Sequence, residues 1–134
     1  MTSPLSRFSS PFYALLRIIA GLMLSMHGTQ KLFGWPPAAQ GHGPFPITSM
    51  PGIAGLLELV LGLLIAIGLL TWIAAFLASG EMAVAYWMVH FKGGFWPIIN
   101  QGELAVLYCF VFLYIAAAGA GIWSIDNARK RTGP

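Results

Sequence analysis

Four apolar runs, each about as long as a bilayer-spanning helix, take up most of this 134-residue sequence. They cover residues 11–33, 52–71, 73–91 and 103–123. Because the hydrocarbon core of a bilayer is about 30 Å thick, a helix needs about 20 apolar residues to cross it. Only 8% of the residues are charged, against about 25% in soluble domains. The sequence therefore predicts an all-α membrane protein, a four-transmembrane-helix bundle that forms a single domain over residues 1–134.

The first apolar run predicts a retained helix and not a cleaved signal peptide. Arg17 interrupts the run, and no clear small-x-small cleavage site follows it. An even number of spans places both termini on one side of the membrane. The basic residues assigned to that side are Arg7, Arg17, Arg129, Lys130 and Arg131, whereas the other side has Lys31 and Lys92. Since basic residues concentrate on the cytoplasmic side, we expect both termini in the cytoplasm.

The net charge of +3 reflects this flanking bias. The terminal Arg129-Lys130-Arg131 cluster is too short to indicate nucleic-acid binding, so the expected charged partner is anionic membrane lipid. Cys109 is the only cysteine, which excludes an intrachain disulfide. Its position in the fourth run predicts a buried apolar filler.

Three glutamates lie in or at the edge of the apolar runs: Glu58, Glu81 and Glu103. A charged side chain at the centre of a bilayer costs about 2.5–3.5 kcal/mol or more unless it is paired or hydrated. These positions are therefore candidates for a functional site.

Depth in the membrane predicts which polar groups meet. At about 1.5 Å per residue, His27 and Glu58 lie at a similar depth, about 9 Å below the outer ends of their helices. They are predicted partners. Arg17 lies near the inner end of the first run, within reach of Glu81 on the third, and we expect these two to form a structural ion pair.

Helical phase limits how many of these groups can share one site. Glu81 and His90 are nine residues apart, about 180° around an ideal helix. Both can face one point only if the helix bends or unwinds between them, so we predict no metal site that uses both residues. His27 and Lys31 are four residues apart and share a face.

The two halves of the chain share a weak sequence repeat. Each half ends one span with a histidine and opens the next with a glutamate: His27, Lys31, Trp35-Pro36 and Glu58, then His90, Lys92, Trp96-Pro97 and Glu103. Two related helical hairpins would produce this pattern, with a site near the axis between them. Chance similarity is the alternative, and the residues alone leave both open.

Three roles stay open for the polar residues: hydrogen-bonding glue between helices, metal binding, and a pocket open to the outer face. No His-Glu-x-x-His helix, phosphate-binding glycine loop or nucleophile elbow is present. We favour the pocket. Its predicted ligand-binding residues are His27, Lys31, Glu58, His90 and Glu103, under a cover of Trp35, Phe95 and Trp96.

The order of several short motifs resembles the DoxX family. The motifs are Gly21-Leu-Met-Leu-Ser-Met-His27-Gly28, Lys31-Leu-Phe-Gly34, Gly55-Leu-Leu-Glu58, Glu81-Met-Ala-Val-Ala-Tyr86, Gly94-Phe-Trp-Pro97, Asn100-Gln-Gly-Glu103 and Trp123-Ser-Ile-Asp126. Together they extend from about Arg17 to Asp126. The resemblance implies a small four-helix protein of the bacterial inner membrane. It also implies a link to redox systems, namely thiosulfate:quinone oxidoreductase, quinol oxidase and oxidative-stress complexes.

The sequence contains no visible haem, flavin or iron-sulfur motif. If the chain takes part in electron transfer, we expect a non-covalently bound quinone or a redox partner protein that carries the cofactor. It would then be a quinone-linked oxidoreductase subunit and not a self-sufficient enzyme.

Our functional hypothesis is a redox-associated subunit with a small polar pocket toward the periplasm. Glu58 and Glu103 would exchange protons, and His27 and His90 would bind the head of the ligand. Two alternatives stay open: a non-catalytic membrane anchor or assembly protein, and a small-solute or proton-coupled transporter. Four short spans would need a homo-oligomer to transport a solute unaided.

Overall fold

The computed structural model describes residues 3–39, 41 and 43–132, and these residues form helices and no strands. A short 3-10 turn, Ser6–Phe8, leads into α1 (Ser9–Phe33), which is followed by α2 (Met50–Ile67) and α3 (Thr71–Ala85). A π-helical turn (Tyr86–His90) and a 3-10 turn (Phe91–Gly93) continue α3. The chain then forms α4 (Pro97–Asn100), α5 (Glu103–Ala118) and α6 (Ile125–Thr132).

Within the described residues, three helical segments are long and apolar enough to cross a membrane: Ser6–Phe33, Met50–Ile67 and Thr71–Gly93. The fourth predicted span, 103–123, was too long, because α5 ends at Ala118. Gly119 and Gly121 have φ angles of 80° and 67°, a left-handed backbone that a helix cannot continue through. The chain is thus an all-helical membrane protein with three spanning candidates and one shorter apolar helix.

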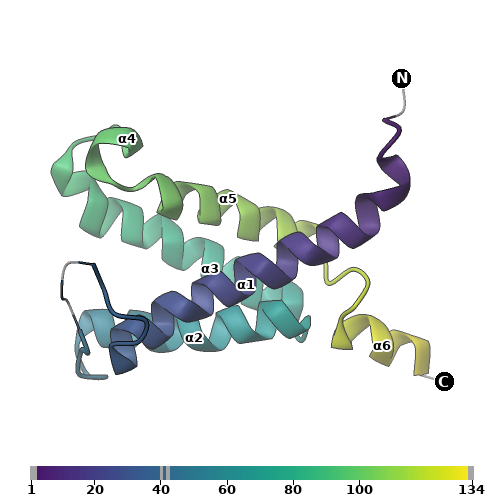
Figure 1. Cartoon of the computed structure of the whole chain (residues 1–134), viewed down its shortest axis with the longest axis horizontal. Coiled ribbons are helices and arrows are strands. Elements are labelled where there is room, and N and C mark those ends of the chain that lie inside the picture. Colours follow the sequence, from purple (N-terminus) through teal and green to yellow (C-terminus); the bar gives the residue numbers. More distant parts are fainter. Residues whose placement is uncertain (1–2, 40, 42, 133–134) are drawn as a thin grey trace.

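The helices pack as two antiparallel pairs. In Figure 1, α1 lies along α2, and α3 lies along α5, while α2 and α3 join the pairs. The described residues of the 34–49 connection (34–39, 41 and 43–49) and residues 86–102 lie at one end of the molecule, which we call the loop end. Both termini, α6 and the short α2–α3 turn lie at the opposite end, the terminal end.

Close contact between α1 and α2 depends on glycine. A Cβ atom on Gly28 would lie 2.5 Å from the backbone oxygen of Gly55, and one on Gly62 would lie 2.6 Å from the oxygen of Gly21. Both distances are shorter than van der Waals contact, so no larger residue fits without separating the helices. Small residues are used in this way to bring membrane helices together.

Arg17 holds the terminal end together, and it does not form the predicted ion pair with Glu81. Its side chain is 0% exposed. Nη1 donates to the carbonyl oxygens of Ile65 and Ala66, both at 2.7 Å, and Nη2 donates to those of Trp123 (2.7 Å) and Ile122 (3.3 Å). The last carbonyls of a helix have no partner within it and carry partial negative charge. The end of α2 therefore provides the acceptors that we had assigned to Glu81.

Asp126 from α6 caps the start of α3. Its carboxylate accepts from the backbone nitrogens of Leu70 (3.0 Å) and Thr71 (2.9 Å) and from Oγ1 of Thr71 (2.8 Å). The residue that directly precedes α3, Leu70, provides no side-chain cap. The cap therefore comes from a segment 55 residues further along the chain. It ties the C-terminal segment to the α2–α3 turn.

We predict that Gly28→Val lowers the free energy of unfolding by about 2 kcal/mol, because the added atoms overlap the α2 backbone. Thermal unfolding in detergent measures the loss. Gly80→Val is the matched control, since a Cβ on Gly80 meets nothing within 4 Å. Equal losses at the two positions would contradict the close packing of α1 against α2.

We predict that acid weakens the cap on α3. Burial alone would raise the pKa of Asp126, but hydrogen bonds from Thr71 and Leu70 and the nearby charge of Arg129 hold this pKa below its ordinary value. A lowered folded-state pKa contributes stability above the unfolded value of about 4, and this stability is lost as the pH falls further. Melting temperatures measured from pH 6 downward should fall more steeply below pH 4 in the wild type than in Asp126→Asn. At neutral pH, this variant should lose about 1 kcal/mol.

Candidate functional site

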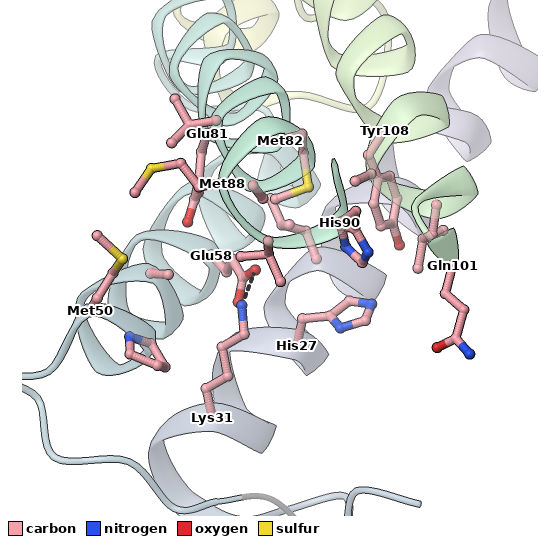
Figure 2. Close-up of a pocket in the computed structure, with 18 of the residues that line it drawn as sticks. His27, Lys31, Met50, Glu58, Glu81, Met82, Met88, His90, Gln101 and Tyr108 are labelled. Atoms are coloured by element: carbon pink, nitrogen blue, oxygen red, sulfur yellow. Dashed lines mark hydrogen bonds and ion pairs between the residues drawn. The ribbon is translucent and has the colours of Figure 1, made fainter. Parts of the chain in front are cut away.

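A cavity of about 560 Å³ opens between the two helix pairs at the loop end (Figure 2). Its walls come from α1, α2, α3, the π-helical turn and the start of α5. Most lining residues are apolar, including three methionines, Met50, Met82 and Met88. Seven polar or ionisable side chains also line the cavity: His27, Lys31, Glu58, Glu81, His90, Gln101 and Tyr108. An apolar chamber with a few polar groups is typical of a small-molecule site.

Lys31 and Glu58 form an ion pair between α1 and α2. Nζ of Lys31 lies 2.6 Å from Oε1 of Glu58. Glu58 is 4% exposed, and its Oε2 has no hydrogen-bond partner in the described part of the chain. Gly55, one turn earlier on α2, leaves room for the stem of Lys31, since a Cβ there would lie 2.8 Å from the Cβ of Lys31. The missing side chain on α2 thus positions the lysine over the glutamate.

Glu58 thus forms its ion pair with Lys31, whereas we had paired it with His27 from depth alone. Depth alone does not distinguish His27 from Lys31, because the lysine side chain extends back along α1 by about one turn. His27 still lines the cavity. Its ring meets the ring of Tyr108 edge-to-face, with the centroids 6.3 Å apart.

Glu81 belongs to the cavity and not to the terminal end. Figure 2 shows its side chain directed from α3 toward the Lys31–Glu58 pair. Neither carboxyl oxygen has a hydrogen-bond partner among the residues described, although both oxygens are buried. A buried polar group without a partner costs free energy, so Glu81 is a candidate for hydrogen bonding to a molecule inside the cavity.

The π-helical turn brings Glu81 and His90 to the same cavity. An α-helix would separate them by about 180°, but the wider turn at Tyr86–His90 changes the phase between them. Unwinding of the helix was the condition under which we expected both residues to face one point. Such π-helical turns occur frequently at functional sites.

Asn100 fixes the connection that follows this turn. The Asn100 side chain is buried, with 8% of the residue exposed. Its Nδ2 donates to the backbone oxygen of Gly94 (2.8 Å) and to the hydroxyl of Tyr86 (3.2 Å). Its Oδ1 accepts from the backbone nitrogen of Gly102 (2.8 Å). The backbone oxygen of Asn100 also lies 3.2 Å from Nδ1 of His90. This network orients the histidine and leaves its Nε2 as the ring nitrogen available to a ligand.

Four predicted site residues do not line the cavity: Glu103, Trp35, Phe95 and Trp96. Glu103 is exposed in the first turn of α5, where its charge suits the positive end of the helix dipole. The three aromatic residues are mostly exposed. The rings of Phe95 and Trp96 pack against each other, with their centroids 5.3 Å apart. Phe45 is the aromatic residue of the 34–49 connection that does reach the cavity.

Tyr108 and Gln101 line the cavity although we did not predict them as site residues from the sequence. Tyr108 is 5% exposed, and its hydroxyl has no hydrogen-bond partner within the described residues. The position of Tyr108 inside an apolar run could have identified it, because a buried tyrosine hydroxyl usually has a hydrogen-bond partner. Gln101 offered no comparable signal, since it lies in a connection whose path the sequence does not specify.

The DoxX family model matches residues 12–91 of this chain. The chain belongs to the DoxX family. The matched region holds five of the seven polar cavity residues: His27, Lys31, Glu58, Glu81 and His90. Gln101 and Tyr108 of this DoxX chain lie beyond it.

Curated relatives cover most of the chain. An uncharacterised protein of Haemophilus influenzae is 40% identical over 92% of this chain and 94% of its own length. An uncharacterised membrane protein of Mycobacterium tuberculosis is 25% identical, over 87% of this chain and 80% of its own. A Bacillus subtilis protein named "Putative oxidoreductase CatD" is 27% identical, over 84% and 82%. No solved structure matches this DoxX chain.

We predict that Lys31→Met destabilises the protein by about 2 kcal/mol, because it leaves Glu58 buried without its counter-ion. The loss is set below that of a fully buried pair because the Lys31 side chain is 31% exposed and water screens part of the interaction. The double variant Lys31→Met/Glu58→Gln should recover at least half of the loss. A double-mutant cycle by thermal unfolding measures the coupling, and simple additivity would contradict the ion pair.

Proposed function

We propose that this protein is a redox-associated subunit of the bacterial inner membrane whose cavity binds a quinone-like molecule. The observation that carries the proposal is the cavity itself, in which apolar walls surround buried groups able to exchange protons. His27 and His90 would bind the polar head of the ligand. Glu58 and Glu81 would exchange protons with it, so Glu81 takes the role first given to Glu103.

The size and walls of the cavity support a ring-shaped apolar ligand. Its volume of about 560 Å³ lies within the usual range for small-molecule sites, about 300–1,000 Å³. Four lining residues from α2, α3 and the π-helical turn are between 44% and 64% exposed: Met50, Val84, Met88 and Val89. On a membrane helix such side chains face lipid. A ligand dissolved in the bilayer could therefore reach the cavity sideways between α2 and α3.

The placement in the membrane is part of the proposal. We infer that α5 is the fourth span, since its 16 residues extend about 24 Å and it packs along α3. Arg7, Arg129, Lys130 and Arg131 all lie at the terminal end, which favours a cytoplasmic position for that end. The cavity at the loop end then lies in the periplasmic half of the membrane.

Electron transfer would need a partner protein. The sequence has no haem, flavin or iron-sulfur motif, so a partner would carry the second redox centre. Lys31 is the only lysine or arginine that lines the cavity in the described residues, and it is already bound to Glu58. The cavity therefore offers little attraction to an anion such as thiosulfate, and any anion chemistry belongs to the partner. The relative whose name contains "oxidoreductase" supports the redox link.

The test is native mass spectrometry of the gently purified protein, with solvent extraction of bound lipids and quinones. We expect about one quinone per chain in the wild type and at least a fivefold lower content in Glu58→Gln and His27→Ala. Glu103→Gln is the matched control, because its carboxylate lies outside the cavity, and it should keep the quinone.

A wild-type chain that retains no quinone but holds a protein partner would overturn the proposal. It would favour the second candidate, a non-catalytic anchor or assembly subunit. One observation already favours that candidate, namely that the Lys31–Glu58 pair joins α1 to α2 and so can serve as glue between helices.

A further inference from the structure

Four buried polar atoms of the cavity have no hydrogen-bond partner in the described chain. They are Oε2 of Glu58, both carboxyl oxygens of Glu81 and the hydroxyl oxygen of Tyr108. All three side chains line the same chamber. Glu58 is 4% exposed, so bulk water does not readily complete its interactions. The chamber therefore presents a set of unfilled hydrogen-bonding positions to whatever occupies it.

These unfilled positions are mainly acceptors. An ionised carboxylate can only accept hydrogen bonds, whereas a tyrosine hydroxyl can donate or accept. If Glu81 carries a proton, one of its oxygens becomes a donor, and two orphaned carboxyl oxygens still accept. The remaining N–H groups of Lys31 do not balance this excess, because that side chain is 31% exposed and water can reach it.

We propose that the cavity prefers ligands that donate hydrogen bonds, and therefore binds the reduced, dihydroxy form of a quinone-type ring more tightly than the oxidised, dicarbonyl form. This inference rests on the proposed function and adds the redox state of the ligand. The two hydroxyl groups of a hydroquinone are donors that the carboxyl oxygens of Glu58 and Glu81 can accept. The carbonyl groups of a quinone only accept hydrogen bonds, so they would leave those carboxyl oxygens without a donor, which costs affinity.

A preference of this kind changes the redox balance of the bound molecule. Binding that favours the reduced form makes reduction of the bound quinone easier than reduction of the free quinone. A tenfold preference corresponds to about 30 mV for a two-electron couple. The chain would then act as a site that retains the reduced ring within the membrane.

The experiment compares a decyl-tailed 1,4-benzoquinone with its hydroquinone, without oxygen, by isothermal titration into full-length protein in lipid nanodiscs. In the wild type we expect the hydroquinone to bind at least tenfold more tightly. Glu81→Gln replaces one orphaned acceptor with an amide donor of the same shape. It should weaken hydroquinone binding and strengthen quinone binding, so that the preference falls below threefold. Glu103→Gln should keep the wild-type preference.

The variant is informative because Glu81 makes no hydrogen bond within the described residues, so its exchange for glutamine should leave the fold intact. A general loss of structure would lower both affinities, whereas the proposal requires them to move in opposite directions. Equal binding of the two forms to the wild type, or an unchanged preference in Glu81→Gln, would overturn this inference and leave the quinone site standing. Binding of neither form would overturn the proposed function itself.

Discussion

The terminal half of the molecule depends on the hydrogen bonds that the buried guanidinium of Arg17 donates. It joins α1 to the carbonyl end of α2 and to the backbone at residues 122 and 123. Because Arg17 holds that returning segment, Asp126 is in place to cap α3. One cation thus joins two helices and the C-terminal segment through hydrogen bonds to backbone carbonyls. This leaves the membrane glutamates uncommitted at that end, and Glu81 is available to the cavity.

The position of the cavity follows from how the two helix pairs are joined. Glycines bring α1 and α2 into backbone contact, and α3 lies along α5, whereas α2–α3 packing is the main connection between the pairs. The short turn between α2 and α3 and the Arg17 contacts hold the pairs together at the terminal end. At the loop end, no hydrogen bond or ion pair among the described residues joins the two pairs, and the 560 Å³ chamber opens there.

Much of this was readable in the sequence, and the errors have physical causes. Run lengths predicted the helices, and the cost of charge in hydrocarbon singled out Glu58 and Glu81, while the four-residue spacing placed His27 and Lys31 on one face. The depth of Arg17 in the membrane did not reveal that the backbone carbonyls of Ile65 and Ala66 accept its hydrogen bonds. Every residue type has a backbone carbonyl, so the sequence does not mark such acceptors. Trp35, Phe95 and Trp96 were assigned to a lid because aromatic composition identifies an interfacial segment but does not tell which ring turns inward.

The π-helical turn at Tyr86–His90 has a consequence for how this fold can vary. Such a turn amounts to one residue inserted into an α-helix. A relative that lacks that single residue would keep the same helix, yet everything beyond it would rotate by about 100°. His90 would then leave the chamber while Glu81 stayed. Insertion or deletion of one residue at this point can therefore change which side chains line one wall of the cavity while the packing of the helices stays the same.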